Sequence, residues 1–325
     1  MKTNLTAPRQ ACNWNKKEDD FTQLFWDQNT SQFWLPEEIP VGDDENSWKA
    51  LTPAQKDVFK KVLAGLTLLD TEQGLVGMPA IGMHTEGHQR KTLISFMGTM
   101  EGIHAKSYSN IFTTLLETFD INDIFRWQEE DKYLQYKAKK IVELYQNIKT
   151  PEDLFIAYCG SVFLESLLFY SGFYYPLYLA GQGKMTKSGE MINLIIRDES
   201  IHGVYIGMLA QELFSTFSSE IQANLLTKIY LLLNDLMLNE YHYTENLYAE
   251  IGLDYEVKQF VKYNANKALM NLGLEPIYDH DEINPIVLNG LNSDTVNHDF
   301  FSMKGNGYQK AVVEYLTDDD FKFEI

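Results

Sequence analysis

Cysteine is scarce in this chain, with only Cys12 and Cys159 among 325 residues. Two cysteines build neither the disulfide framework of a small secreted protein nor a cysteine-rich zinc or iron–sulfur site. Residues 1–17 are polar and lack the apolar core of a secretory signal. We therefore expect two reduced thiols in a cytoplasmic protein.

Positive charge is also in short supply. The chain has 27 lysine and arginine residues against 46 aspartate and glutamate residues, for a formal net charge of -19. A chain this acidic repels a phosphate backbone, and no basic stripe runs along it. We expect no nucleic-acid partner, and we expect any nucleotide chemistry to take place on another protein.

Only one apolar run, residues 161–180, reaches the length that a bilayer demands. Glu165 and Pro176 lie inside it, and no basic anchors flank it. We interpret the run as a buried core helix and expect no contact with a membrane. An acid inside such an apolar helix requires a partner or a function.

Patterns typical of β-strands are absent, and helix signals recur. Thr-Pro sequences at 52–53 and 150–151 are typical helix starts, with the threonine as N-cap. Ser188 and either Ser218 or Ser219 are predicted to cap later helices. Helices are expected from 53 onward, over 89–116, 120–148, from 151 onward, from 188 onward, over 219–252 and over 255–272. The 120–148 stretch is rich in charge and is expected to lie at the surface.

Two Glu-x-x-His pairs carry the main chemical signal: Glu101 with His104, and Glu199 with His202. Residues three apart share one face of a helix, so each pair offers two ligands to a metal ion. One such pair is a weak signal because it occurs by chance on solvated helices. Two such pairs in one chain are a stronger signal. Tyr108 follows one turn after His104, which places a phenol beside the metal.

Two further acids, Asp70 and Glu165, interrupt apolar patterns on two other predicted helices. Two Glu-x-x-His pairs with one carboxylate from each of two more helices are typical of ferritin-like dinuclear proteins. Four buried carboxylates repel one another unless cations compensate, and two divalent ions do so. Ligation rich in oxygen suits manganese or iron better than zinc. The sequence predicts an all-α, ferritin-like helical bundle with a dinuclear metal–carboxylate centre, and leaves manganese or iron open.

Other histidines are weaker candidates. His84 and His88 lie one turn apart, but not in the His-Glu-x-x-His order of zinc proteases, and nearby glycines weaken a helix there. His280 lies in a polar loop. We interpret all three as surface groups.

The two ends of the chain differ from its middle. Residues 21–34 are dense in aromatics and are expected to form an arm that packs on the main body. The last residues interleave acids with Phe321, Phe323 and Ile325, a pattern typical of a mobile tail that docks on a partner. We predict a helical domain with its N-terminal arm over 1–295 and a flexible tail over 296–325.

Seven motifs, spread in order along the chain, resemble those of the small, radical-generating subunit of class Ib ribonucleotide reductases. They are Asn13-Trp14-Asn15, Leu66 to Thr71, Met100 to Ser109, Leu164-Glu165-Ser166, Phe169 to Phe173, Arg197 to Gly203, and Asn297 to Ser302. The resemblance implies two manganese or two iron ions per chain with bridging glutamates. It assigns one ion to Asp70, Glu101 and His104, and the other to Glu165, Glu199 and His202.

The same resemblance implies roles beyond the metals. Tyr108 is the expected site of a stable radical, and Phe169, Phe173 and Ile195 match positions that line its pocket. Trp34 and Asp198 match the start of a radical relay, with Tyr308, or less favourably Tyr315, as its exit. The implied partners are a second copy of the chain in a homodimer, the large reductase subunit bound by the tail, and a flavodoxin-like activator protein. The one departure, Gly102, touches no expected ligand.

Two other interpretations stay open on the sequence. A metal-dependent oxidase or monooxygenase related to these subunits shares the metal site but makes no use of Tyr308 or the tail. A ferritin-like storage protein predicts many metals per chain and assembly into a cage.

Overall fold

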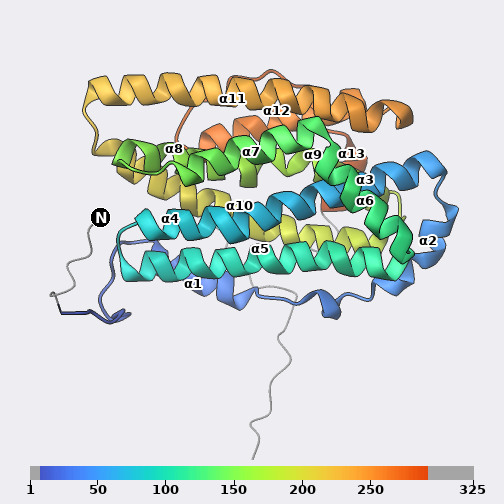
Figure 1. Cartoon of the computed structure of the whole chain (residues 1–325), viewed down its shortest axis with the longest axis horizontal. Helices are drawn as coiled ribbons and strands as arrows, with labels where there is room; N and C mark the ends of the chain where they lie inside the picture. Colours follow the sequence, from blue (N-terminus) through green and yellow to red (C-terminus); the bar gives the residue numbers. More distant parts are fainter. Residues whose placement is uncertain (1–7, 292–325) are drawn as a thin grey trace, which may run out of the picture. The chain divides into compact units, whose positions relative to one another are not determined.

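The computed structural model describes residues 8–291, and every regular element in that range is a helix (Figure 1). The first elements are α1 (Thr22–Ser31), η1 (Pro36–Glu38), η2 (Val41–Asp44), α2 (Glu45–Ala50), α3 (Pro53–Glu72), η3 (Gln73–Gly77), α4 (Met78–His84), α5 (His88–Leu115), α6 (Thr118–Glu130) and α7 (Lys132–Gln146). They are followed by α8 (Pro151–Phe163), η4 (Leu164–Leu168), α9 (Tyr170–Gly181), α10 (Thr186–Ser215), α11 (Ser219–Tyr248), η5 (Ala249–Ile251), α12 (Asp254–Asn271) and α13 (Pro285–Leu291). The predicted all-α class is confirmed.

Most predicted helix starts are confirmed. Thr52 and Thr150 each form a capping box at the N-terminus of α3 and α8, and Ser218 caps α11. The prediction for Ser188 was wrong, because α10 begins at Thr186 and Ser188 lies in its first turn. Its backbone N–H donates instead to Asp44, a residue of η2 that is distant in the sequence, at 2.6 Å. A carboxylate from another segment thus caps this helix, and local sequence gives no sign of it.

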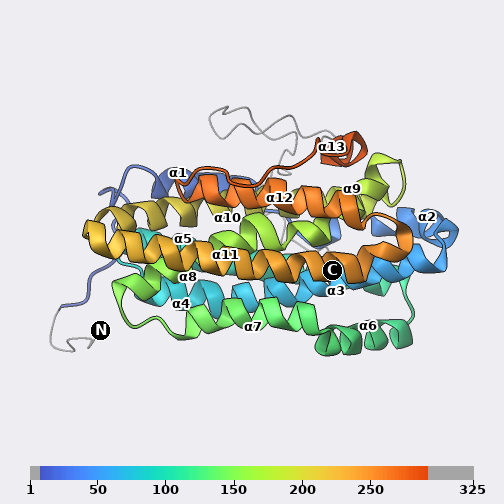
Figure 2. The same ribbon diagram turned by 90° about the horizontal axis from the view of Figure 1, so that it is seen from above.

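Four segments form the centre of the bundle: α3, α5, α8 with η4, and α10. Helix α3 packs on α5, while α10 packs on α8, on η4 and on α5. The long helices run nearly along one common direction in both views, and α11 and α12 lie side by side over this centre (Figures 1 and 2). The centre of the bundle is therefore enclosed by helices.

The long apolar run forms the consecutive elements α8, η4 and α9. Residues Pro151–Gly181 are long and apolar enough to cross a bilayer, but 94% of their most apolar window is buried in the protein. The interpretation as a core helix is therefore confirmed. The sequence did not predict that η4, which carries Glu165, is a π-helical turn, nor that a second one, η3, follows α3 directly.

The predicted boundary between domain and tail is not settled by the fold. Residues 296–325, including Tyr308 and Tyr315, lie outside the described residues. The division into 1–295 and 296–325 stays a prediction.

Candidate metal centre

Four buried helical segments bring all six predicted ligands together. None of the six side chains has measurable exposure to solvent. They are Asp70 from α3, Glu101 and His104 from α5, Glu165 from η4, and Glu199 and His202 from α10.

The ligand atoms form two overlapping groups, and within each group they lie no more than 4.8 Å apart. One group consists of Asp70, Glu101, His104 and Glu199, and the other of Glu101, Glu165, Glu199 and His202. Glu101 and Glu199 belong to both groups. The geometry therefore suits two metal ions that share two bridging glutamates.

The two Glu-x-x-His pairs interlock across α5 and α10. His104 Nδ1 lies 2.8 Å from Glu199 Oε1, and His202 Nδ1 lies 2.8 Å from Glu101 Oε1. Each imidazole faces the glutamate of the other helix, so a metal beside either histidine reaches carboxylates from both helices. Only the packing of α5 on α10 creates this arrangement.

The donor set fits divalent cations. Both carboxylate oxygens of Asp70, Glu101 and Glu199 are buried and meet no hydrogen-bond donor in acceptable geometry within residues 8–291. Buried polar atoms of native proteins nearly always have partners, so these oxygens require one. Metal ions ligated by carboxylate and imidazole satisfy that need and neutralise the charge.

The electrostatics of the cluster reflect this crowding. Burial and the charge of Glu101 raise the pKa of Asp70 well above its usual range, and burial with the charges of Glu101 and Glu165 does the same for Glu199. Burial opposes ionisation of Glu101 as well, but the adjacent imidazoles of His104 and His202 lower its pKa to about 2. Burial lowers the pKa of His104, yet Asp198 and Glu101 raise it to about 10. The site therefore favours positive charge at its centre.

A second layer of side chains orients His104. Its Nε2 lies 3.2 Å from Asp198 Oδ2, which leaves Nδ1 toward the ligand cluster. The indole of Trp34, in the segment between α1 and η1, donates to the same oxygen at 2.8 Å. Gln32 Nε2 donates to the other oxygen of Asp198, also at 2.8 Å. Asp198 thus joins Trp34 to His104, and their role in a radical relay stays a prediction. Gln32 is a contact that sequence reasoning missed.

Tyr108 lies on α5 beside the cluster and is fully buried. Burial and the negative charges of Asp70 and Glu199 raise the pKa of its phenol well above the usual value. The phenol is therefore protonated at neutral pH. Phe169, Phe173 and Ile195 are also buried in the core.

Sequence reasoning gave no role to Gln73, which contacts a predicted ligand, or to Tyr145, which contacts Gln73. Gln73 follows Asp70 by three residues and donates to Glu165, while Tyr145 from α7 binds Gln73. The buried position of Gln73 on the core side of its helix was the available signal. By contrast, His84, His88 and His280 are exposed, as predicted.

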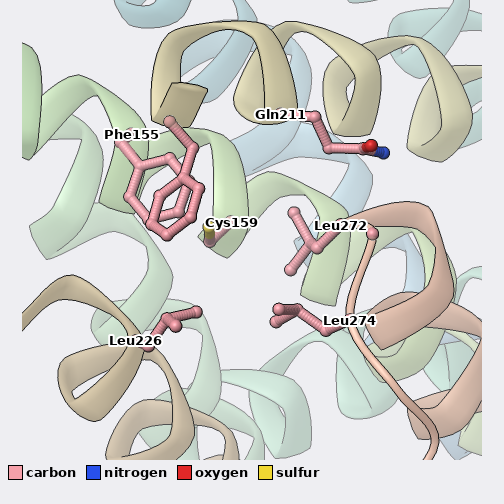
Figure 3. Close-up of a pocket in the computed structure, with 8 residues that line it drawn as sticks. Phe155, Cys159, Gln211, Leu226, Leu272 and Leu274 are labelled. Carbon is pink, nitrogen blue, oxygen red and sulfur yellow. The ribbon is translucent and has the colours of Figure 1, made fainter. Parts of the chain in front are cut away.

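A cavity of about 190 Å³ is lined by none of the predicted ligands. Apolar side chains dominate its wall, and Cys159 lies among them (Figure 3). No charged side chain lines it.

Comparison with known proteins places the chain in a family. The family described as "Ribonucleotide reductase, small chain" matches residues 11–285. This chain belongs to that family. It is 58% identical over 323 residues to the ribonucleoside-diphosphate reductase subunit beta of Bacillus subtilis (strain 168), with 98% of each chain covered. It is 42% identical over 317 residues to ribonucleoside-diphosphate reductase 2 subunit beta of Escherichia coli (strain K12), with 96% of this chain and 98% of the relative covered.

A solved structure agrees with the family assignment. The crystal structure of dimanganese(II)-NrdF from Streptococcus sanguinis superimposes with a TM-score of 0.85 at 44% identity, over 87% of this chain and 100% of the other. The predicted ferritin-like bundle is confirmed. As a ribonucleotide reductase small chain, the protein works with a large subunit, and the oxidase and storage interpretations are not supported.

Proposed function

We propose that the six clustered residues of this reductase small chain hold two manganese or two iron ions, and that the centre produces a radical on Tyr108. The observation that carries the proposal is the burial of the six ligands beside a buried phenol. The similar protein from Streptococcus sanguinis is a dimanganese(II) form, which favours manganese in this chain as well. When bound and oxidised, the metal pair supplies the one-electron oxidant.

The residues of the chain set up the chemistry around that oxidant. Burial and the negative charges of Asp70 and Glu199 raise the pKa of the phenol, so Tyr108 keeps its proton until an electron is removed. A neighbouring carboxylate of the cluster then accepts that proton. Tyr108 has no measurable exposure to solvent, so the surrounding core keeps water and reductants away from a radical.

The radical leaves through the chain of contacts His104, Asp198 and Trp34. Hydrogen bonds join these three side chains without a gap. In this proposal Tyr308 is the exit residue, and the tail 296–325 binds the large subunit, which holds the nucleotide and the catalytic cysteine. The chain acts in the cytoplasm as a homodimer, and a flavodoxin-like protein activates its manganese form.

Electron paramagnetic resonance tests the radical. One sample receives Mn(II), the flavodoxin-like activator and oxygen, and another receives Fe(II) and oxygen alone. We expect a tyrosyl signal in the wild-type protein that disappears in Tyr108→Phe, although this variant binds metal as before. A Tyr108→Phe protein with full reductase activity contradicts the assignment.

Deletion of residues 310–325 tests the tail. We expect the tyrosyl radical to persist and reductase activity with the large subunit to be lost. Unchanged activity with the large subunit contradicts the proposed role of the tail.

A further inference from the structure

The four carboxylate ligands are not held alike. Both oxygens of Asp70, Glu101 and Glu199 meet no donor in acceptable geometry within the described part of the chain, but one oxygen of Glu165 accepts a hydrogen bond. Gln73 Nε2 donates a short hydrogen bond to Glu165 Oε1. The other oxygen, Oε2, meets no donor and lies 3.5 Å from His202 Nδ1. Glu165 therefore has one oxygen anchored to the protein and one directed at the cluster.

A contact at the oxygen of the Gln73 amide fixes which way the amide group points. The phenol of Tyr145 donates to Gln73 Oε1 at 2.6 Å, and Gln73 Nε2 also donates to Ser161 Oγ at 2.9 Å. Burial and the negative charge of Glu165 raise the pKa of Tyr145 well above its usual value, so the phenol keeps its proton. A carbonyl oxygen only accepts, so a donor on that side leaves the amide hydrogens toward Glu165.

The backbone leaves room for this contact at Gly77, the last residue of η3. A Cβ at Gly77 would lie 2.4 Å from Gln73 Oε1 and 2.7 Å from Tyr145 Cε2. Real Cβ atoms do not come that close, so any larger residue displaces one of the two side chains. The absence of a side chain at Gly77 is what lets Tyr145 reach the amide.

Neighbouring residues of one helical stretch serve the two ligand groups. Asp70, a member of one group, lies in the last turn of α3, and Gln73 opens the π-helical turn η3 three residues later. Among the described residues, no donor in acceptable geometry holds Asp70 as Gln73 holds Glu165, although the phenol of Tyr108 lies beside it. The two positions therefore differ in how firmly the protein orients their outer carboxylates.

We infer that Gln73 is a positioning residue for the metal ligand Glu165, and that Tyr145 acts through Gln73 by fixing the direction of its amide. With Oε1 held by Gln73, Glu165 would offer Oε2 to an ion held in the cluster. The inference rests on the proposed dinuclear centre and adds an asymmetry between its two positions.

Titration of the full-length protein with Mn(II) tests the inference, with calorimetry for affinity and electron paramagnetic resonance for pairing of the ions. Tyr145→Phe removes only the hydroxyl that fixes the amide. We expect it to lower the affinity for one of the two Mn(II) ions by about tenfold and to leave the affinity for the other unchanged. A tenfold loss is usual when a residue that hydrogen-bonds to a metal ligand is removed. At intermediate loading, uncoupled Mn(II) then accumulates.

Tyr175→Phe is the matched control. Tyr175 is also buried, and its hydroxyl has no hydrogen-bond partner in the described structure. Its removal is expected to leave both Mn(II) affinities unchanged. A loss equal to that of Tyr145→Phe overturns the inference, because it shows that any buried hydroxyl matters.

A double-mutant cycle separates positioning from general packing. Gln73→Met keeps the length of the side chain but removes all three of its hydrogen bonds, to Glu165, to Ser161 and from Tyr145. We expect Tyr145→Phe to add no further loss of Mn(II) affinity in that background. Additive losses, or equal losses for both ions, overturn the inference. Thermal unfolding of the metal-free proteins shows whether each variant folds. If Gln73→Met does not fold, the comparison of Mn(II) affinity between Tyr145→Phe and Tyr175→Phe still tests the inference.

The wild-type titration separates a failure of the proposed dinuclear centre from a failure of the positioning role of Gln73 and Tyr145. A wild-type protein that binds no pair of Mn(II) ions overturns the dinuclear centre and the inference together. If the wild-type protein binds two ions and Tyr145→Phe binds them equally well, only the positioning role is overturned.

Discussion

Trp34 and His104 bind the same carboxylate oxygen: the indole nitrogen lies 2.8 Å, and the imidazole Nε2 lies 3.2 Å, from Asp198 Oδ2. The two rings are nearly parallel, with centroids 6.2 Å apart. Asp198 therefore links the metal cluster to a residue of the N-terminal arm. This link orients His104, and in the proposed relay it is the route by which an electron crosses between Trp34 and the cluster.

Asp198→Asn is expected to reduce reductase activity by about 10- to 100-fold, in line with the effect of other groups behind a metal ligand. An amide keeps the shape of the side chain but places a donor or a neutral acceptor where His104 and Trp34 meet a charge. Turnover with the large subunit measures the loss. The tyrosyl radical of Tyr108 is measured in the same samples, and we expect it to form. Activity equal to that of the wild-type protein contradicts the role of Asp198 in the relay.

Glu165→Ala is expected to lower Mn(II) binding from two ions per chain to one. Glu165 belongs to only one of the two ligand groups, so the group around Asp70 and His104 keeps all its ligands. Saturating Mn(II) is then expected to stabilise the variant less than the wild-type protein, since each site filled at 100 times its Kd contributes about 2.7 kcal/mol. Metal analysis and thermal unfolding measure both effects. Glu143→Ala, at an exposed acid of α7, serves as the control.

Metal affinity is expected to rise with pH. Burial lowers the pKa of His104, but Asp198 and Glu101 raise it to about 10, so the metal-free protein holds a proton there at neutral pH. A metal ion at Nδ1 must displace that proton, so protons compete more strongly as the pH falls. Each proton released makes the affinity change by about tenfold per pH unit. Calorimetry in two buffers of different ionisation enthalpy counts the protons, and binding without proton release contradicts the prediction.

Lys137→Met is expected to destabilise the protein by about 3–5 kcal/mol, the usual cost of leaving one partner of a buried ion pair alone. Lys137 and Glu240 are both buried, and Lys137 Nζ lies 2.6 Å from Glu240 Oε1. The same nitrogen lies 3.8 Å from the centre of the Tyr243 ring. Denaturation in urea measures the loss. The double variant Lys137→Met with Glu240→Leu is expected to recover most of it, and a double variant less stable than Lys137→Met contradicts the prediction.

The sequence by itself determined the helical class and the six candidate ligands. Helical spacing makes the Glu101–His104 and Glu199–His202 pairs visible, and an acid such as Asp70 or Glu165 stands out in an apolar pattern. These signals are local or compositional, so they need no knowledge of the packing. The family resemblance then supplied what spacing does not contain, namely the roles of Tyr108, Trp34 and Asp198.

Tertiary structure decided everything that depends on contacts between distant segments. Asp44 caps α10 from another part of the chain, so the prediction that Ser188 caps this helix was wrong. Residues 120–148 looked like solvated surface, yet Lys137 is buried because Glu240 from α11 neutralises it. The anchoring of Glu165 by Gln73 and Tyr145 requires a π-helical turn and the open space at Gly77. The pattern along one helix shows which residue types are present there. Which charge, hydrogen-bond donor or open space those residues meet depends on how the other helices pack against them.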